Sequence, residues 1–110
     1  MGEYILYHAK IWTAEKDAEW ADAMWVSGDK ILAVGAYQDM EDVASAHVRR
    51  IDMNGQMIIP YQIGSLAKGK KANFCVLNRN VFEVPVDKLG TTAAVTVVFE
   101  GSPVKGGLPY

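Results

Sequence analysis

The chain has 110 residues, 50% of them hydrophobic and 22% charged, which is enough apolar material for the core of one domain. The 11 lysines and arginines against 13 acids give a formal net charge of −2, which excludes the basic balance of a general nucleic-acid binder. The longest apolar stretches are far shorter than the roughly 20 residues of a membrane-spanning helix, and the N-terminus lacks the features of a signal peptide. We therefore expect a soluble, cytoplasmic protein that contacts neither membrane nor nucleic acid.

The first 35 residues are typical of β structure. Residues 4–13 predict one strand, in which one face carries Tyr4, Leu6 and His8 and the other carries Ile5, Tyr7, Ala9 and Ile11. The acidic segment 15–22 is too short and polar for a stable helix and predicts a loop that joins two strands. Residues 23–26 and 30–34 flank Gly28 and Asp29, which is the pattern of a two-residue hairpin turn.

A short helix and two more strands follow. The apolar spacing over residues 37–46 is helical, and acids lie early in this segment, where the helix dipole favours them. Residues 48–52 alternate as a strand, and the Asn-Gly pair at 54–55 predicts a tight turn. Residues 57–59 then predict a short strand that ends at Pro60.

The last third of the chain also predicts strands. A Gly- and Lys-rich loop at 64–71 leads into a buried-type strand at 74–77, and residues 84–89 predict a Pro-led turn or a single helical turn. Residues 92–99 form the longest β-branched run, and Glu100-Gly101 turns the chain back. We expect seven to nine short strands and one or two short helices in a mainly β fold, either a β-sandwich or a partly closed barrel.

The segment 64–71, Gly-Ser-Leu-Ala-Lys-Gly-Lys-Lys, is hereafter the Lys-rich loop. It matches the phosphate-binding loop pattern except at its last position, where Lys71 replaces the Ser or Thr that coordinates magnesium. The loop also precedes a strand rather than a helix, and only Phe74 lies close by as a base-stacking aromatic residue. We interpret it as a solvated charged turn.

The other reactive side chains do not form a recognisable catalytic pattern. His8 and His47 lack the short-range pairing of metal-binding motifs, and the acids of residues 15–22 and 39–42 are explained by solvation of a loop and a helix start. Cys75 is the single cysteine and lies in an apolar strand, which favours a buried, inert thiol. We assign no catalytic, cofactor-binding or metal-ligating residue.

Three tryptophans leave a binding function open. Trp12, Trp20 and Trp25 could stack on a sugar or a base, although such residues in a small β domain more often form a core or an interdomain face. The alternative function is therefore a small-ligand or oligonucleotide binding module that uses these tryptophans or the Lys-rich loop.

Two ordered blocks of the sequence can be compared with a known family. The first comprises residues 4–13, 20–35 and 51–60, and the second comprises residues 63–80 with continuations at 84–89 and 95–101. In this order the blocks resemble the N-terminal segment and the C-terminal return of the amidohydrolase superfamily, most nearly its YtcJ-like metal-dependent branch. Asn73 and Cys75 stand where the family usually has Asp and a Val-like residue.

The resemblance implies a composite β-sandwich formed by residues 1–60 and 61–110. It also implies a truncated protein, in which the catalytic (β/α)₈ barrel is deleted at about residues 60–63, either by engineering or naturally. The family's metal ligands lie in the barrel, so this chain is expected to be non-catalytic and without cofactor. A full-length parent would use a divalent metal such as zinc to hydrolyse C–N or related bonds. We expect self-association through the surface that the barrel would cover, with contributors among Trp12, Trp20 and Trp25.

Overall fold

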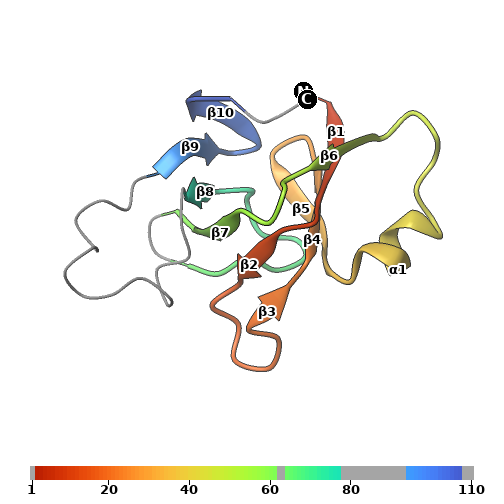
Figure 1. The fold of residues 1–110 in the computed structure, drawn as a ribbon, viewed down its shortest axis with the longest axis horizontal. Coiled ribbons are helices and arrows are strands. Elements are labelled where there is room, and N and C mark those ends of the chain that lie inside the picture. Colours follow the sequence, from red (N-terminus) through yellow and green to blue (C-terminus); the bar gives the residue numbers. More distant parts are fainter. Residues whose placement is uncertain (1, 62–63, 78–93, 108–110) are drawn as a thin grey trace.

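The computed structural model describes residues 2–61, 64–77 and 94–107, which contain ten strands and one short helix (Figure 1). The fold is mainly β, as predicted. In chain order the elements are β1 (Glu3–Tyr7), β2 (Lys10–Trp12), β3 (Trp20–Ala21), β4 (Ala23–Ser27), β5 (Lys30–Gly35), α1 (Tyr37–Glu41), β6 (Arg49–Asp52), β7 (Met57–Pro60), β8 (Phe74–Leu77), β9 (Ala94–Phe99) and β10 (Ser102–Lys105).

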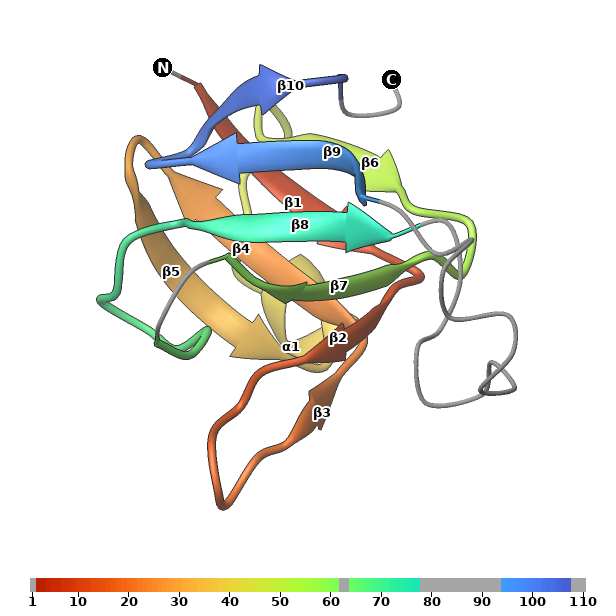
Figure 2. The ribbon, with the colours of Figure 1, turned by 90° about the vertical axis from the view of Figure 1, so that its left-hand side faces the viewer.

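The strands form two sheets. The four-stranded sheet has the order β5-β4-β1-β6, and the six-stranded sheet has the order β10-β9-β8-β7-β2-β3. Both sheets are mixed, because β6 runs parallel to β1 and β7 runs parallel to β2 while the other neighbours are antiparallel. In Figure 2 the six-stranded sheet lies in front of the four-stranded sheet and its strands run across those behind. Of the two predicted architectures, the described residues adopt the sandwich-like one and form no closed barrel.

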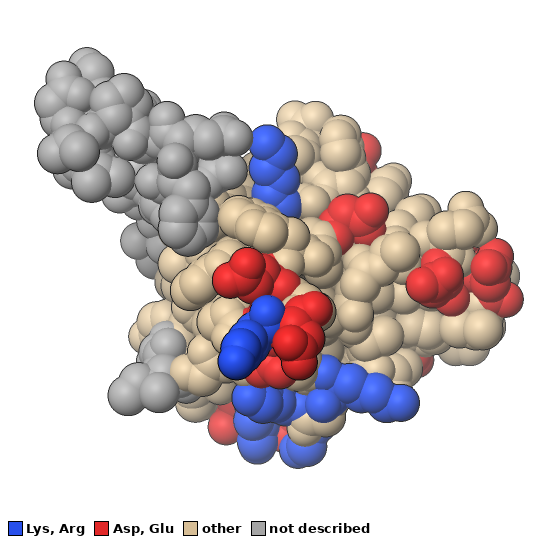
Figure 3. All heavy atoms as spheres, turned by 90° about the horizontal axis from the view of Figure 1, so that it is seen from below, with Lys and Arg blue, Asp and Glu red and all other residues tan. Residues whose placement is uncertain are grey.

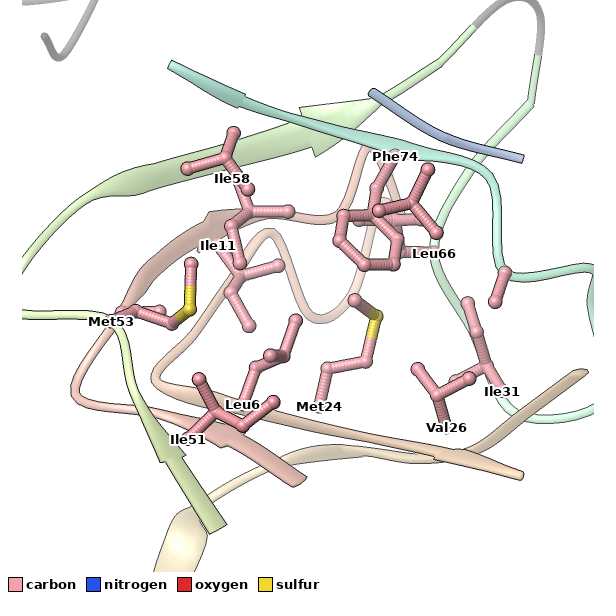
Figure 4. Close-up of a cluster of buried hydrophobic side chains, with 14 of the residues drawn as sticks. Leu6, Ile11, Met24, Val26, Ile31, Ile51, Met53, Ile58, Leu66 and Phe74 are labelled. Carbon is pink, nitrogen blue, oxygen red and sulfur yellow. The ribbon is translucent and has the colours of Figure 1, made fainter. Parts of the chain in front are cut away.

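The main hydrophobic core lies between the two sheets (Figure 4). Each sheet turns alternate side chains toward the other, and each fully buried apolar side chain stabilises the fold by roughly 1.5–3 kcal/mol. The four-stranded sheet contributes Leu6, Met24, Val26, Ile31 and Ile51, and the six-stranded sheet contributes Ile11, Ile58, Phe74, Val76 and Val98.

The prediction of one strand over residues 4–13 is wrong at His8, where the chain passes from one sheet to the other. β1 ends at Tyr7, β2 begins at Lys10, and His8 between them has a φ of 54°. Leu6 and Ile11 would face opposite sides of a continuous strand, yet both are buried in the main core. The break therefore reverses the phase of the alternation.

A second crossing between the sheets lies beside the first. Asn54 and Gly55, with φ of 54° and 80°, form the predicted tight turn, and they join β6 in one sheet to β7 in the other. The Met53 N–H donates to the Tyr7 carbonyl at 2.8 Å, and the Gly55 N–H donates to the His8 carbonyl at 2.7 Å. The two segments thus change sheets together, as a hydrogen-bonded pair.

Two local predictions have different outcomes. The hairpin at Gly28-Asp29 is confirmed, because β4 and β5 pair antiparallel on either side of this turn. The helix predicted over residues 37–46 ends at Glu41. Met40 packs with Trp25 on the outer face of the four-stranded sheet, but Val43 is 74% exposed, so a longer helix would gain little packing.

The segments before and after residues 62–63 meet in the six-stranded sheet. β7 pairs antiparallel with β8, Pro60 lies opposite Phe74, and the Tyr61 N–H donates to the Asn73 carbonyl at 3.0 Å. The predicted strand at 92–99 is described from Ala94 onward as β9, and Glu100-Gly101 is the predicted turn. The turn predicted at 84–89 lies outside the described residues.

Candidate functional site

The Trp20 cleft is a hollow of about 290 Å³ between the loop that joins β2 to β3, the end of β5 and the Lys-rich loop. Sequence reasoning missed it, because its walls come from loops interpreted as solvated. The one local signal was a tryptophan within an acidic loop. The residues that line it are Thr13, Glu15, Lys16, Asp17, Ala18, Trp20, Ala21, Val34, Gly35, Leu66, Ala67 and Lys68.

Thr13 fixes the β2–β3 loop that forms one wall of the cleft. This buried side chain accepts a hydrogen bond from the Glu15 N–H at 3.0 Å, and its hydroxyl donates to the Ala18 carbonyl. The Thr13 carbonyl accepts from the Leu66 N–H at 2.8 Å, which ties this wall to the Lys-rich loop. A buried hydroxyl that both donates and accepts a hydrogen bond within the fold is typical of a structural role.

Glu15 forms a second link between the same two loops. Its Oε2 accepts a hydrogen bond from the Ser65 hydroxyl and lies 3.5 Å from Lys70 Nζ. The Ser65 hydrogen bond, helped by the Lys70 charge, holds the pKa of Glu15 below its usual range. Glu15 is therefore ionised at neutral pH and does not suit the role of a general acid.

The Lys-rich loop borders a second hollow of about 470 Å³, in which every described lysine has an acidic partner. Lys71 Nζ lies 3.1 Å from Asp29 Oδ2 and 3.6 Å from Glu100, and Lys30 lies 3.7 Å from Asp29. The hydrogen bond between Lys71 and Asp29 lowers the pKa of Asp29 and raises the pKa of Lys71. These ion pairs offset the positive charge that an anion would need.

The backbone of the Lys-rich loop also differs from a phosphate-binding loop. The N–H of Gly69 donates to Ile31 at 2.8 Å, and the N–H of Lys70 donates to Ala67 at 3.1 Å. The segment continues into strand β8 rather than a helix. These N–H groups donate within the fold, whereas a phosphate-binding loop directs such groups at its ligand.

The histidines lie in different settings. His8 Nδ1 is 2.9 Å from Asp52 Oδ1 at the sheet crossing, while His47 Nδ1 lies 3.0 Å from the Ser45 hydroxyl in the loop before β6. Within residues 2–61, 64–77 and 94–107, no three His, Cys, Asp or Glu side chains converge as they would to hold a metal ion. Cys75 is buried on the outer face of the six-stranded sheet.

The three tryptophans lie in three environments. Trp25 is only 8% exposed and its Nε1 donates to Glu3 Oε2 at 2.8 Å, so it offers little surface to a partner. Trp12 is partly buried on the outer face of the six-stranded sheet. Trp20 is 50% exposed and lines the Trp20 cleft.

Charges of both signs are intermingled on the face shown in Figure 3, where acidic and basic side chains lie beside one another. A protein that follows a phosphate backbone presents a continuous basic stripe instead. No helix in the described part of the chain is long and apolar enough to cross a membrane.

The fold thus defines a sandwich-like, mainly β protein with a cleft lined by Trp20. No family model matches the chain, and no curated protein matches it. A solved structure described as an uncharacterized metal-dependent hydrolase from Pyrococcus horikoshii OT3 is similar over 54% of this chain, with 15% sequence identity and a TM-score of 0.47. The similarity covers 12% of that protein's chain.

Proposed function

We propose that this chain is the composite β-sandwich domain of a metal-dependent amidohydrolase, of the YtcJ-like branch, without its catalytic barrel. The pairing of β7 with β8 carries the proposal, because it makes neighbours of the two sequence blocks that resemble the family. Where one domain is inserted into another, the chain leaves the host domain and returns to it at points that lie close together. Pro60 and Phe74 are directly opposite each other, which suits such an insertion at residues 60–63.

The role of the domain is structural in this proposal. In a full-length parent it would hold the two ends of the barrel together, while the barrel would supply the ligands for a divalent metal such as zinc. The donors described in this chain do not fit that metal, because His8 and His47 lie in different parts of the fold and neither belongs to a cluster of three ligands among the described residues. Hydrolysis of C–N or related bonds therefore belongs to the parent.

An insertion experiment tests the proposed position of the barrel. A folded reporter domain with adjacent termini, placed between Gln62 and Ile63, should leave the urea-unfolding transition of this domain cooperative. The matched control places the same reporter between Gly28 and Asp29, in the β4–β5 turn, whose backbone is packed against Gly101. We expect that insertion to unfold the protein. The proposal is wrong if the control site accepts the reporter and the 62–63 site does not.

An activity assay tests the non-catalytic role. The purified chain, supplied with zinc or manganese, should not hydrolyse acyl-amino acids or cyclic amides, and metal analysis should find no stoichiometric metal. Hydrolysis that a chelator abolishes, and that persists through further purification, would contradict this role.

A further inference from the structure

We propose that the Trp20 cleft binds a small aromatic anion, a ring or a fused pair of rings that carries one carboxylate. This inference concerns the described chain itself and does not depend on the proposed function.

The shape and lining of the cleft favour a ring. Ala21, Val34 and the buried Leu66 supply apolar surface, and Trp20 offers half of its surface to solvent beside them. Ligand pockets are typically apolar concavities of roughly 300–1,000 Å³ with a few polar groups at the rim. At about 290 Å³ the cleft suits one or two rings and is too small for an oligonucleotide. An aromatic ligand would also gain a stacking contact with the indole.

The charges at the rim favour an anion. Lys16 and Lys68 both line the cleft. The structure records no side-chain ion pair or hydrogen bond for either lysine, whereas every other Lys or Arg whose side chain it describes has one or another electrostatic interaction. The opposing charges are Asp17, which lies on the same rim, and Glu15, which is already held by Lys70. With the Glu15–Lys70 pair set aside, two positive charges face one negative charge, which suits a ligand with a single negative charge.

The cleft is also preformed. Its two main walls are far apart in the sequence, yet the Leu66 N–H donates to the Thr13 carbonyl at 2.8 Å and the Ser65 hydroxyl donates to Glu15. Walls held by such contacts do not need to be ordered when a ligand binds, so a small ligand loses less affinity to conformational entropy.

The test is a titration of the ¹⁵N-labelled chain with naphthalene-2-carboxylate at low salt. We expect saturable shifts of the Trp20 indole N–H and of the backbone amides of Ala21, Gly35 and Ala67. Naphthalene-2-carboxamide, which keeps the rings and lacks the charge, should bind about two- to fivefold more weakly. Cyclohexanecarboxylate, which keeps the charge and lacks the aromatic ring, should bind about tenfold more weakly.

Matched variants locate the site. Trp20→Leu keeps an apolar side chain without the ring and should weaken binding about tenfold. Lys16→Gln and Lys68→Gln should each weaken it about two- to fivefold and reduce its salt dependence. Lys30→Gln, outside the cleft, should leave the affinity unchanged. Urea unfolding of each variant separates lost binding from lost folding.

Three results would overturn the proposal. The first is the absence of saturable shifts at the cleft up to millimolar ligand. The second is an affinity that neither Trp20→Leu nor Lys68→Gln reduces in folded protein. The third is the same set of shifts on concentrating the protein alone, because a second copy of the chain would then be the occupant.

Discussion

Gly101 holds a position that no other residue fits. It lies in the turn between β9 and β10 with a φ of 84°, and a Cβ atom there would lie 1.9 Å from the Gly28 carbonyl oxygen. Its own carbonyl accepts a hydrogen bond from Tyr4 Oη at 3.1 Å, and its N–H donates to Ala72 at 3.0 Å. The turn after β9 is therefore clamped onto the hairpin turn between β4 and β5.

Gly101→Ala should lower the free energy of unfolding by about 3 kcal/mol or more, because it adds a backbone clash to the strain of a left-handed conformation. Gly69→Ala is the matched control, since Gly69 has a φ of 88° and open space around a Cβ atom. That variant should lose only about 1–2 kcal/mol. Urea unfolding measures both, and equal losses would show that the close approach to Gly28 contributes nothing.

Asp52 joins the two sheet crossings through a carboxylate. It accepts a hydrogen bond from the Asn54 N–H at 2.8 Å and lies 2.9 Å from His8 Nδ1. The Asn54 hydrogen bond, followed by the His8 contact, lowers the pKa of Asp52. A lowered folded pKa means that this stabilisation is complete above the ordinary aspartate pKa and is lost as the pH falls through the folded value.

Asp52→Asn should therefore destabilise the protein at neutral pH, and the difference from the unmodified protein should shrink as the pH falls below about 4. Urea unfolding at a series of pH values measures this difference. Asp17→Asn is the control, because the structure records no partner for Asp17. A difference for Asp52→Asn that is constant from neutral to acidic pH would contradict the assigned role.

At the scale of elements, neither residues 1–60 nor residues 61–110 contain a complete hydrophobic core. All four strands of the four-stranded sheet come from residues before 53, but β8 and β9 bring Phe74, Val76 and Val98 into the core between the sheets. Removing them would expose the inner face of the other sheet and leave β7 as an unpaired edge.

Residues 1–60 and 61–110 expressed separately should each fail to fold cooperatively, and mixing them should restore β structure. Circular dichroism and amide spectra of the two fragments, alone and mixed, measure this. A cooperative unfolding transition in either fragment alone would contradict a shared core.

The sequence predicts the elements whose shape is set locally. Gly28 with its flanking apolar runs is sufficient for the β4–β5 hairpin, and the Asn-Gly pair is sufficient for the turn at 54–55. The break at His8 is not predictable in this way, because both faces of β1 carry apolar side chains, which conceals the change of phase. It is stabilised by hydrogen bonds from a segment much later in the chain.

The Trp20 cleft could not be predicted for a similar reason. Lys16 and Lys68 belong to separate polar loops, and each loop alone is typical of a solvated connection. The contacts of Thr13 and Glu15 with the Lys-rich loop, which are distant in the sequence, bring the two lysines to one rim. That the chain carries no catalytic residue stays a prediction.

At the scale of the whole molecule, the six-stranded sheet has an apolar outer face. Trp12, Ile59, Tyr61 and Val97 are only partly buried there, and they pack against Met57, Cys75 and Leu77, which are already buried within the chain. Ile59 and Tyr61 lie next to the proposed position of the missing barrel. This outer face is the surface that we expect the barrel to cover in a parent enzyme.

The chain should dimerise through this outer face as its concentration rises. Burial of a few hundred Å² of apolar surface favours association by several kcal/mol, at roughly 25 cal/mol per Å², before the entropic cost of association is subtracted. Sedimentation across a wide concentration range measures it. Ile59→Thr should weaken the dimer about tenfold. Leu32→Thr, at a 40% exposed position in the other sheet, should not. A strictly monomeric protein that binds no hydrophobic dye would contradict the expectation.

The paired crossings at His8 and at Asn54-Gly55 determine how the molecule opens. Each sheet contains strands that continue covalently into the other sheet, so neither sheet can separate without pulling on its neighbour. Subglobal opening of a single sheet is therefore suppressed. In native-state hydrogen exchange, the most protected amides of β1 and β7 should share one opening free energy and one denaturant dependence. Earlier release of β1 would show that the sheets behave as two cooperative units.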